Sequence, residues 1–116
     1  MSAQARLGDL DLDKVIHEKA RLLVLTYLAS SDSPETGFTE LRDALRMTAG
    51  NLSIQLKTLE AAGYISITKS FRDNKPYTAI RLSVDGRRAL DGYLGSLETI
   101  LAMARPTRDD AHKEAP

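Results

Sequence analysis

The sequence predicts an α+β fold that is mainly α, formed by a single domain. Three observations predict this class: apolar residues at helical spacing through the first half of the chain, two short runs of alternating residues near the middle, and leucines spaced four, three and four near the end. With 116 residues, 42% of them hydrophobic, the chain has material for one modest core. We expect the domain over residues 12–104, after a flexible lead-in over 1–11 and before a disordered, charged tail over 105–116.

The first helix is predicted over residues 13–30. Its apolar side chains cover far more than one stripe, which is typical of a helix buried on more than one side. One side is expected to pack on the domain core, and another to face a second subunit. The composition of residues 31–37 then predicts a loop.

Two short amphipathic helices with a tight corner between them are predicted over residues 39–46 and 48–62. Three leucines of the second helix fall at i, i+4 and i+7 and line its core face: Leu52, Leu56 and Leu59. Thr48 is the expected N-cap of this helix, and Gly63 is expected to end it. The short link between the two helices is typical of a helix-turn-helix.

Two β-strands are predicted over residues 64–71 and 77–82, because both runs alternate with period two and contain β-branched and aromatic residues. Residues 72–76 have the composition of a turn, so the two strands are expected to form a hairpin. A helix-turn-helix followed at once by a hairpin is the element order of a winged helix, in which the hairpin turn is the tip of the wing.

Three segments carry a resemblance to a known family: Gly-Asn-Leu-Ser…Leu-Lys-Thr-Leu-Glu-Ala-Ala-Gly-Tyr-Ile from residue 50, Phe-Arg…Lys-Pro-Tyr-Thr…Arg-Leu-Ser from residue 71, and Asp-Gly-Arg-Arg-Ala-Leu from residue 85. Over residues 12–101 the chain resembles the MarR-like and related small winged helix-turn-helix transcriptional regulators of bacteria and archaea, in particular the compact single-domain kind. We therefore expect a sequence-specific regulator that binds a pseudo-palindromic operator of double-stranded DNA as a homodimer. The resemblance implies repression, by occluding polymerase, as the usual mode of action.

Candidate DNA-binding residues lie on the outward face of the second helix and on the hairpin. They are Thr48, Gly50, Asn51, Ser53, Ile54, Gln55, Lys57, Thr58, Lys69, Arg72 and Lys75. Asn51 and Gln55 can bond adenine edges, and Lys57 can reach guanine or phosphate. The net charge of the chain is zero, but residues 46–81 hold six basic and two acidic residues, so the positive charge is concentrated on the proposed binding elements.

Two of these assignments have alternatives. Ile54 can touch a thymine methyl group if it faces outward, or it is a core residue if the helix is rotated. Arg72 and Lys75 can enter the minor groove or clamp phosphates, but a solvated hairpin tip has the same sequence pattern. The nearby Asp73 weakens contact with phosphate.

The last helix is predicted from a Ser83 cap to about residue 104. Its leucines form a coiled-coil seam of under two heptads, which together with the apolar first helix favours a homodimer through the terminal helices. The expected interface residues are Ile16, Leu23, Tyr27, Leu90, Tyr93, Leu94, Leu97, Ile100 and Leu101. The alternative is that the last helix folds back on its own domain. Three glycines in this helix indicate either marginal stability or a close neighbour: Gly86, Gly92 and Gly95.

Several classes of function are not supported by the sequence. The chain has no cysteine, its two histidines have no partner at metal-ligand spacing, and no serine has a candidate base beside it, so we expect no metal, no cofactor and no enzyme activity. Its first residues do not have the apolar core of a signal peptide, and no apolar run approaches the ~20 residues that span a bilayer, so we expect a cytoplasmic protein. A small-molecule effector would have to bind between the terminal helices and the winged core. The alternative function is a winged helix that binds a protein partner without specific DNA binding.

Overall fold

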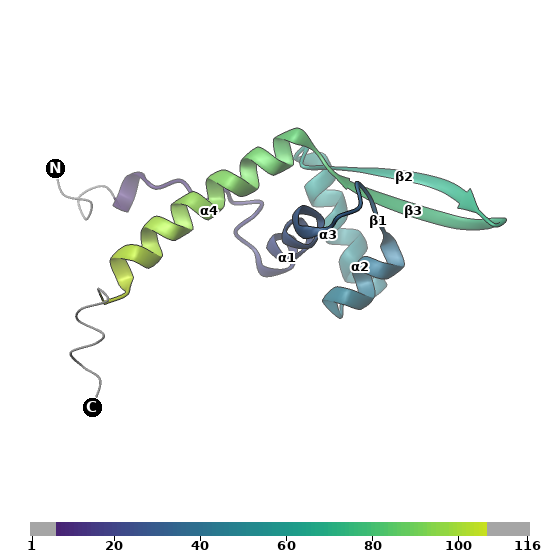
Figure 1. The fold of residues 1–116 in the computed structure, drawn as a ribbon, viewed down its shortest axis with the longest axis horizontal. Coiled ribbons are helices and arrows are strands. Elements are labelled where there is room, and N and C mark those ends of the chain that lie inside the picture. Colours follow the sequence, from purple (N-terminus) through teal and green to yellow (C-terminus); the bar gives the residue numbers. More distant parts are fainter. Residues whose placement is uncertain (1–6, 107–116) are drawn as a thin grey trace, which may run out of the picture.

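The computed structural model describes residues 7–106 and shows a winged-helix arrangement of four helices and three strands (Figure 1). The elements, in chain order, are α1 (Lys19–Ser30), β1 (Thr36–Gly37), α2 (Phe38–Leu45), α3 (Ala49–Ala61), β2 (Ile65–Arg72), β3 (Lys75–Leu82) and α4 (Val84–Ala104). The predicted class, α+β and mainly α, is confirmed. The outer residues of the expected lead-in and tail, 1–6 and 107–116, lie outside the described residues.

The first helix begins at Lys19, so the prediction that it begins near residue 13 was wrong. Asp13 closes a turn instead, because its Oδ1 accepts hydrogen bonds from the backbone amides of Val15 and Ile16 at 2.8 and 3.2 Å. Glu18 then caps α1 and accepts from the amides of Ala20 and Arg21, and the bond from Ala20 lowers the pKa of the Glu18 carboxyl. Two acidic side chains thus take amides that a longer helix would have used.

The helix-turn-helix forms as predicted. Arg46 ends α2 in the left-handed region at φ 54°, and the Thr48 hydroxyl caps α3 by accepting from the Asn51 amide at 3.1 Å. The three leucines of the core face of α3 are all buried. Gly63, at φ +82°, turns the chain out of α3 and into β2.

The sheet is antiparallel, with the order β1-β3-β2. β1 is a two-residue strand within the expected loop, and its Thr36 pairs with Ile80 of β3. The hairpin turn is shorter than the predicted five residues, because Asp73 and Asn74 both take positive φ, 51° and 63°. These are residues that tolerate the left-handed region, so a two-residue turn can connect the strands; β3 begins two residues earlier than predicted, and β2 ends one residue later.

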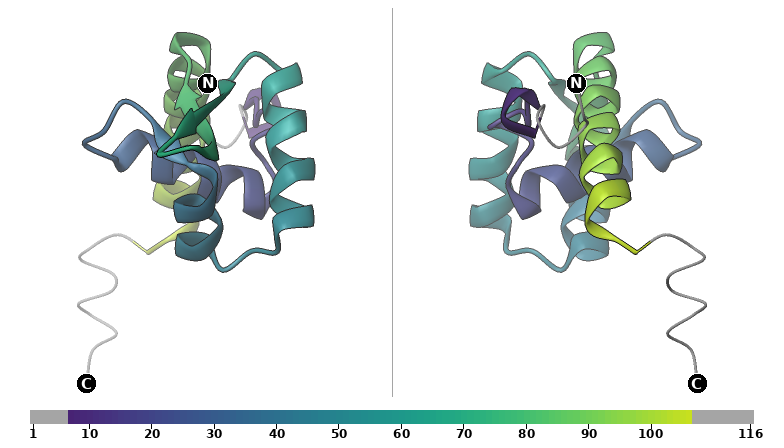
Figure 2. Two further views of the ribbon diagram at one scale, coloured as in Figure 1. Left: turned by 90° about the vertical axis from the view of Figure 1, so that its right-hand side faces the viewer. Right: turned by 90° about the vertical axis from the view of Figure 1, so that its left-hand side faces the viewer.

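The core lies where α1, α2, α3 and the inner half of the hairpin meet the first half of α4, and it contains Ile16, Leu25, Leu41, Leu52, Leu59, Ile80 and Leu90. The wing projects from one end of this body and the second half of α4 from the other (Figure 1). The end-on views show α3 at one side of the domain (Figure 2). Among the described residues, no helix has both the length and the apolar character needed to cross a membrane.

The beginning of α4 is locked against the chain that follows α3. Ser83 caps α4 through the Gly86 amide, and it also bonds the Gly63 carbonyl with its hydroxyl and the Tyr64 carbonyl with its amide. A Cβ on Gly86 would overlap the Tyr64 carbonyl oxygen, whereas a Cβ on Gly92 or Gly95 would meet nothing within 4 Å. Close approach therefore explains only the first of the three glycines.

Candidate nucleic-acid interface

The outer face of α3 presents the side chains that the sequence predicted to face outward. Gly50, Asn51 and Lys57 are exposed, and Ile54 is 63% exposed. The alternative that Ile54 belongs to the core is therefore wrong. Ser53 and Thr58 are half-buried at the margins, and the Thr58 hydroxyl donates to the Ile54 carbonyl at 3.3 Å.

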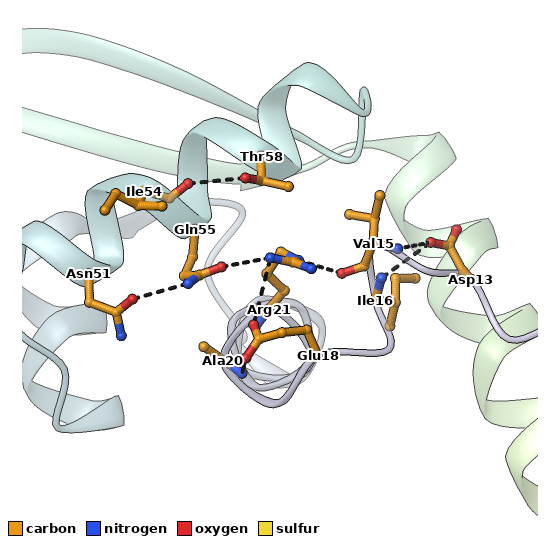
Figure 3. Close-up of polar contacts among 10 residues, drawn as sticks. All are labelled: Asp13, Val15, Ile16, Glu18, Ala20, Arg21, Asn51, Ile54, Gln55 and Thr58. Atoms are coloured by element: carbon orange, nitrogen blue, oxygen red, sulfur yellow. Dashed lines mark hydrogen bonds and ion pairs between the residues drawn. The ribbon is translucent and has the colours of Figure 1, made fainter.

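The two amide side chains of α3 are bonded in a chain that starts on α1 (Figure 3). Arg21 Nη1 donates to Gln55 Oε1 at 2.9 Å, and Gln55 Nε2 donates to Asn51 Oδ1 at 3.0 Å. Gln55 thus already has partners on both of its amide atoms. Sequence reasoning missed Arg21, and the available signal was one cation within the apolar stretch of residues 20–25.

A cleft separates α3 from the hairpin, and it has a volume of about 250 Å³. Ser53 and Lys57 line it from α3, and Lys69 and Thr78 line it from the strands. In the described part of the chain, neither lysine forms an ion pair, because no carboxylate oxygen lies within 4.0 Å of its ammonium. The fold thus brings together two predicted cations that are 12 positions apart in the sequence.

The wing differs from the prediction at Arg72. Its guanidinium donates to Glu35 Oε1 at 2.8 Å and lies 3.8 Å from the centre of the Tyr77 ring. Glu35 also pairs with Arg81 at 3.5 Å. A minor-groove role for Arg72 stays a prediction, and it requires this pair to open.

The tip of the wing carries an aromatic residue that the sequence analysis did not select. Phe71 is 76% exposed and lies across from Pro76 on the neighbouring strand. Because side chains alternate along a strand, Phe71 shares its face of the hairpin with Lys69 and Ile67, while Arg72 belongs to the other face. The face that carries Phe71 is the one that borders the cleft with α3.

Three of the expected dimer residues belong to the core of the chain itself, which corrects the prediction. Ile16, Leu90 and Tyr93 are 0%, 2% and 5% exposed, and the Tyr93 hydroxyl bonds His17 Nδ1 at 2.9 Å. The first half of α4 thus packs on its own domain, which was the alternative arrangement.

Other expected interface residues remain accessible. Leu23 on α1 and Leu94 and Leu101 on the second half of α4 are each 38% exposed. The Tyr27 hydroxyl donates to Glu40 on α2 at 2.7 Å, and this bond raises the pKa of Tyr27. Leu97 and Ile100 are half-buried.

A second, larger cleft of about 560 Å³ lies between the loop after α1, the end of β3 and the beginning of α4. Its lining includes Leu28, Asp32, Arg81 and Arg87. It lies between a terminal helix and the winged core, the place where a small-molecule effector would have to bind. Among residues 7–106, no three His, Cys, Asp or Glu side chains gather in a way that could hold a metal ion.

A helix-turn-helix with an exposed polar face, next to a β-hairpin and a cleft lined by lysines, defines the class of winged-helix domains. A family model described as "Winged helix DNA-binding domain" matches residues 20–101, and the chain belongs to that family. The family consists of DNA-binding domains rather than enzymes, in agreement with the expectation that this chain is not an enzyme.

The chain is also similar to one curated protein and to several solved structures. An uncharacterised protein of Methanocaldococcus jannaschii is 31% identical over 81 residues, which cover 70% of this chain and 86% of the relative. Among solved structures, a transcriptional regulator homologue from Pyrococcus horikoshii has a TM-score of 0.75 at 20% identity, covering 91% of this chain and all of that one. Sco3205, a MarR family regulator from Streptomyces coelicolor solved in complex with DNA, has a TM-score of 0.60 at 21% identity and covers 97% of this chain and 78% of that one. The winged-helix part of the resemblance is confirmed by the family model, and these structures show that the chain shares its fold with transcriptional regulators, a MarR family member among them.

Proposed function

We propose that this chain is a sequence-specific transcriptional regulator of prokaryotic type that acts in the cytoplasm as a homodimer on a pseudo-palindromic operator. The observation that carries the proposal is the outer face of α3, where Asn51, Ile54 and Lys57 stand exposed on a helix whose opposite face is fixed in the core. An amide, an apolar group and a cation on one helix face are groups that read base edges and phosphates in a major groove.

The side chains beside α3 support DNA binding on the same side of the domain. Lys57 and Lys69 flank the cleft beside α3 and can bind the phosphates at the edge of the groove. Phe71 extends beyond them on the same face of the wing, where an apolar side chain can lie in the adjoining minor groove. Repression by occlusion of polymerase is the mode that the family resemblance implies.

The homodimer is supported by the accessible leucines of the terminal helices, Leu23, Leu94 and Leu101. An exposed seam on a helix that projects from the body can pair with a second copy. Two α3 helices in such a dimer would contact half-sites about 34 Å apart, one turn of DNA.

The test is fluorescence anisotropy of the protein with duplex DNA from upstream of its own gene and with a scrambled duplex of equal length. The salt range is about 50 to 300 mM, because phosphate contacts make affinity fall steeply with salt. Preference for the native duplex supports the proposal. Equal affinity for both duplexes would contradict the proposed sequence specificity.

Lys57→Ala should weaken DNA binding and reduce the slope of log affinity against log salt concentration by about one, the value of one phosphate contact. The free energy of unfolding should stay within about 0.5 kcal/mol of the wild-type value. Arg88→Ala is the matched control, since Arg88 is an exposed cation on α4, away from the interface. Equal effects of both changes would show that only net charge matters.

One observation favours the alternative, a module that binds a protein partner. Glu35 engages both Arg72 and Arg81, so the wing is less basic than its composition indicates. Absence of binding to any duplex at the lowest salt would favour this alternative, and the same cationic face would then bind an acidic protein surface.

A further inference from the structure

The side chain of Arg21 sets the direction of two amides on α3. Arginine has five N–H donors and no acceptor, so the atom of Gln55 that faces it must be the carbonyl oxygen. The Gln55 Nε2 group then faces Asn51 and needs an acceptor there, which is Oδ1. One cation on α1 thus fixes the orientation of both amides, whose oxygen and nitrogen would otherwise be interchangeable.

The guanidinium of Arg21 is itself held in place by Val15 and Glu18, on the side away from α3. Its Nε donates to the Val15 carbonyl at 2.5 Å, and its Nη1 lies 3.9 Å from Glu18 Oε2. The side chain is 19% exposed and lies on the inner side of Gln55, away from the outer face of α3 (Figure 3). A charge-assisted bond from a side chain with this many partners is among the stronger hydrogen bonds in proteins.

The bond from Gln55 also sets the orientation of the Asn51 amide, which is exposed on the outer face of α3. Its Oδ1 is directed along the helix towards Gln55, and its Nδ2 points away (Figure 3). Within the described residues, no hydrogen bond uses this Nδ2 group. Asn51 therefore offers both of its donors to a ligand, while its oxygen already accepts one bond from Gln55.

We infer that Arg21 is a positioning residue for base specificity, and that it makes Asn51 favour a base whose major-groove edge presents acceptors and no donor, guanine or thymine. This inference rests on the proposed function. Guanine presents N7 and O6 and thymine presents O4, so each accepts from Nδ2. Adenine N7 can also accept from Nδ2, but the N6 group beside it is a donor that faces the same amide, and it could bond Asn51 Oδ1 only by sharing that oxygen with Gln55 or displacing Gln55 from it. This inference differs from the contact between Asn51 and adenine that the sequence suggested.

The experiment is selection of bound duplexes from a randomised double-stranded library by the full chain, followed by sequencing. Asn51→Asp identifies the base that residue 51 contacts, because it replaces the Nδ2 donor with an acceptor and keeps Oδ1 for Gln55. The position whose preference changes is the contacted one. The wild type should favour guanine or thymine there by roughly fivefold or more, and Asn51→Asp should shift the preference towards cytosine, whose N4 group donates.

Arg21→Met tests the positioning role. It frees both amides to reverse, so the preference at the same position should fall below about twofold with adenine now accepted, while the salt slope stays unchanged because Arg21 contacts no phosphate. Arg21→Lys retains a donor to Gln55 and should restore the preference. Lys19→Met is the matched control, since Lys19 is an exposed cation on the same helix, and it should leave base preference unchanged.

The outcomes separate the inference from the proposed function. Selection of adenine at the contacted position by the wild type, or an unchanged preference in Arg21→Met at wild-type thermal stability, overturns the inference and leaves a DNA-binding regulator. A library from which no sequence is enriched overturns both.

Discussion

Two identical substitutions in α4 are expected to change stability in opposite directions. A Cβ on Gly86 would overlap the Tyr64 carbonyl oxygen and lie 2.9 Å from Leu82 Cδ1, whereas a Cβ on Gly92 would meet nothing within 4 Å. Gly92→Ala therefore gains only helix propensity and should stabilise the protein by up to about 1 kcal/mol.

Gly86→Ala has the same gain in propensity but must displace a backbone carbonyl. Overpacking of this kind costs about 1 to 3 kcal/mol or more. The Tyr64 carbonyl also accepts from the Ser83 amide at 3.0 Å, and losing that bond costs roughly another 1 kcal/mol or more. The net expectation is a loss of about 1 to 3 kcal/mol, which for a domain of this size lowers the melting temperature by roughly 4 to 20 °C.

The assay is thermal unfolding followed by far-ultraviolet circular dichroism, at one fixed protein concentration so that self-association does not shift the midpoint. The pair of variants is its own control, because side-chain chemistry and helix are the same. If Gly86→Ala melts at or above the wild-type temperature, the close packing of α4 against the end of α3 is refuted.

Three further outcomes are expected. Thr48→Ala should lower the free energy of unfolding by about 1 kcal/mol in denaturant titrations, and Thr48→Ser should restore it, because the hydroxyl caps α3. The hydrogen bond to Asp13 raises the pKa of Tyr64 to about 12, so the stability that this bond contributes is fully present below the ordinary pKa near 10 and is lost as pH rises through about 12. The free energy of unfolding should therefore fall less between pH 10 and 12 in Tyr64→Phe than in the wild type. Equal losses in the two proteins would contradict the assignment. Leu94→Glu should reduce the mass by light scattering from about twice 12.8 kDa to one chain, while Val84→Glu, an exposed change outside the leucine seam, should leave the dimer intact.

The helix-turn-helix and the wing could be predicted from the sequence because their signals are local. The leucine spacing of α3, the Thr48 cap and the positive-φ glycine each act within a few residues. The outward position of Asn51 and Ile54 follows from the same helical period.

The features that the sequence did not predict depend on polar side chains that have several possible hydrogen-bond partners. The early start expected for α1 failed because Asp13 and Glu18 hold backbone amides that a helix would otherwise use. Arg21 and Gln55 are 34 positions apart, and neither residue type indicates the other. Glu35, which pairs with Arg72 of the wing, is likewise distant in sequence and lies in the loop just before β1, where no periodic pattern points to a partner.

The segment before α1 connects the side chains around α3 with the terminal helix α4. Asp13 accepts from the Tyr64 hydroxyl after α3, the Val15 carbonyl holds Arg21, and the Asp11 carbonyl accepts from Ser96 on α4 at 3.2 Å. The matched family region begins at residue 20, beyond all of these contacts. A domain trimmed to that boundary would keep the helices and strands of the winged helix apart from Lys19, the first residue of α1. It would lose the hydrogen bonds that connect Arg21, Tyr64 and Ser96 through this segment.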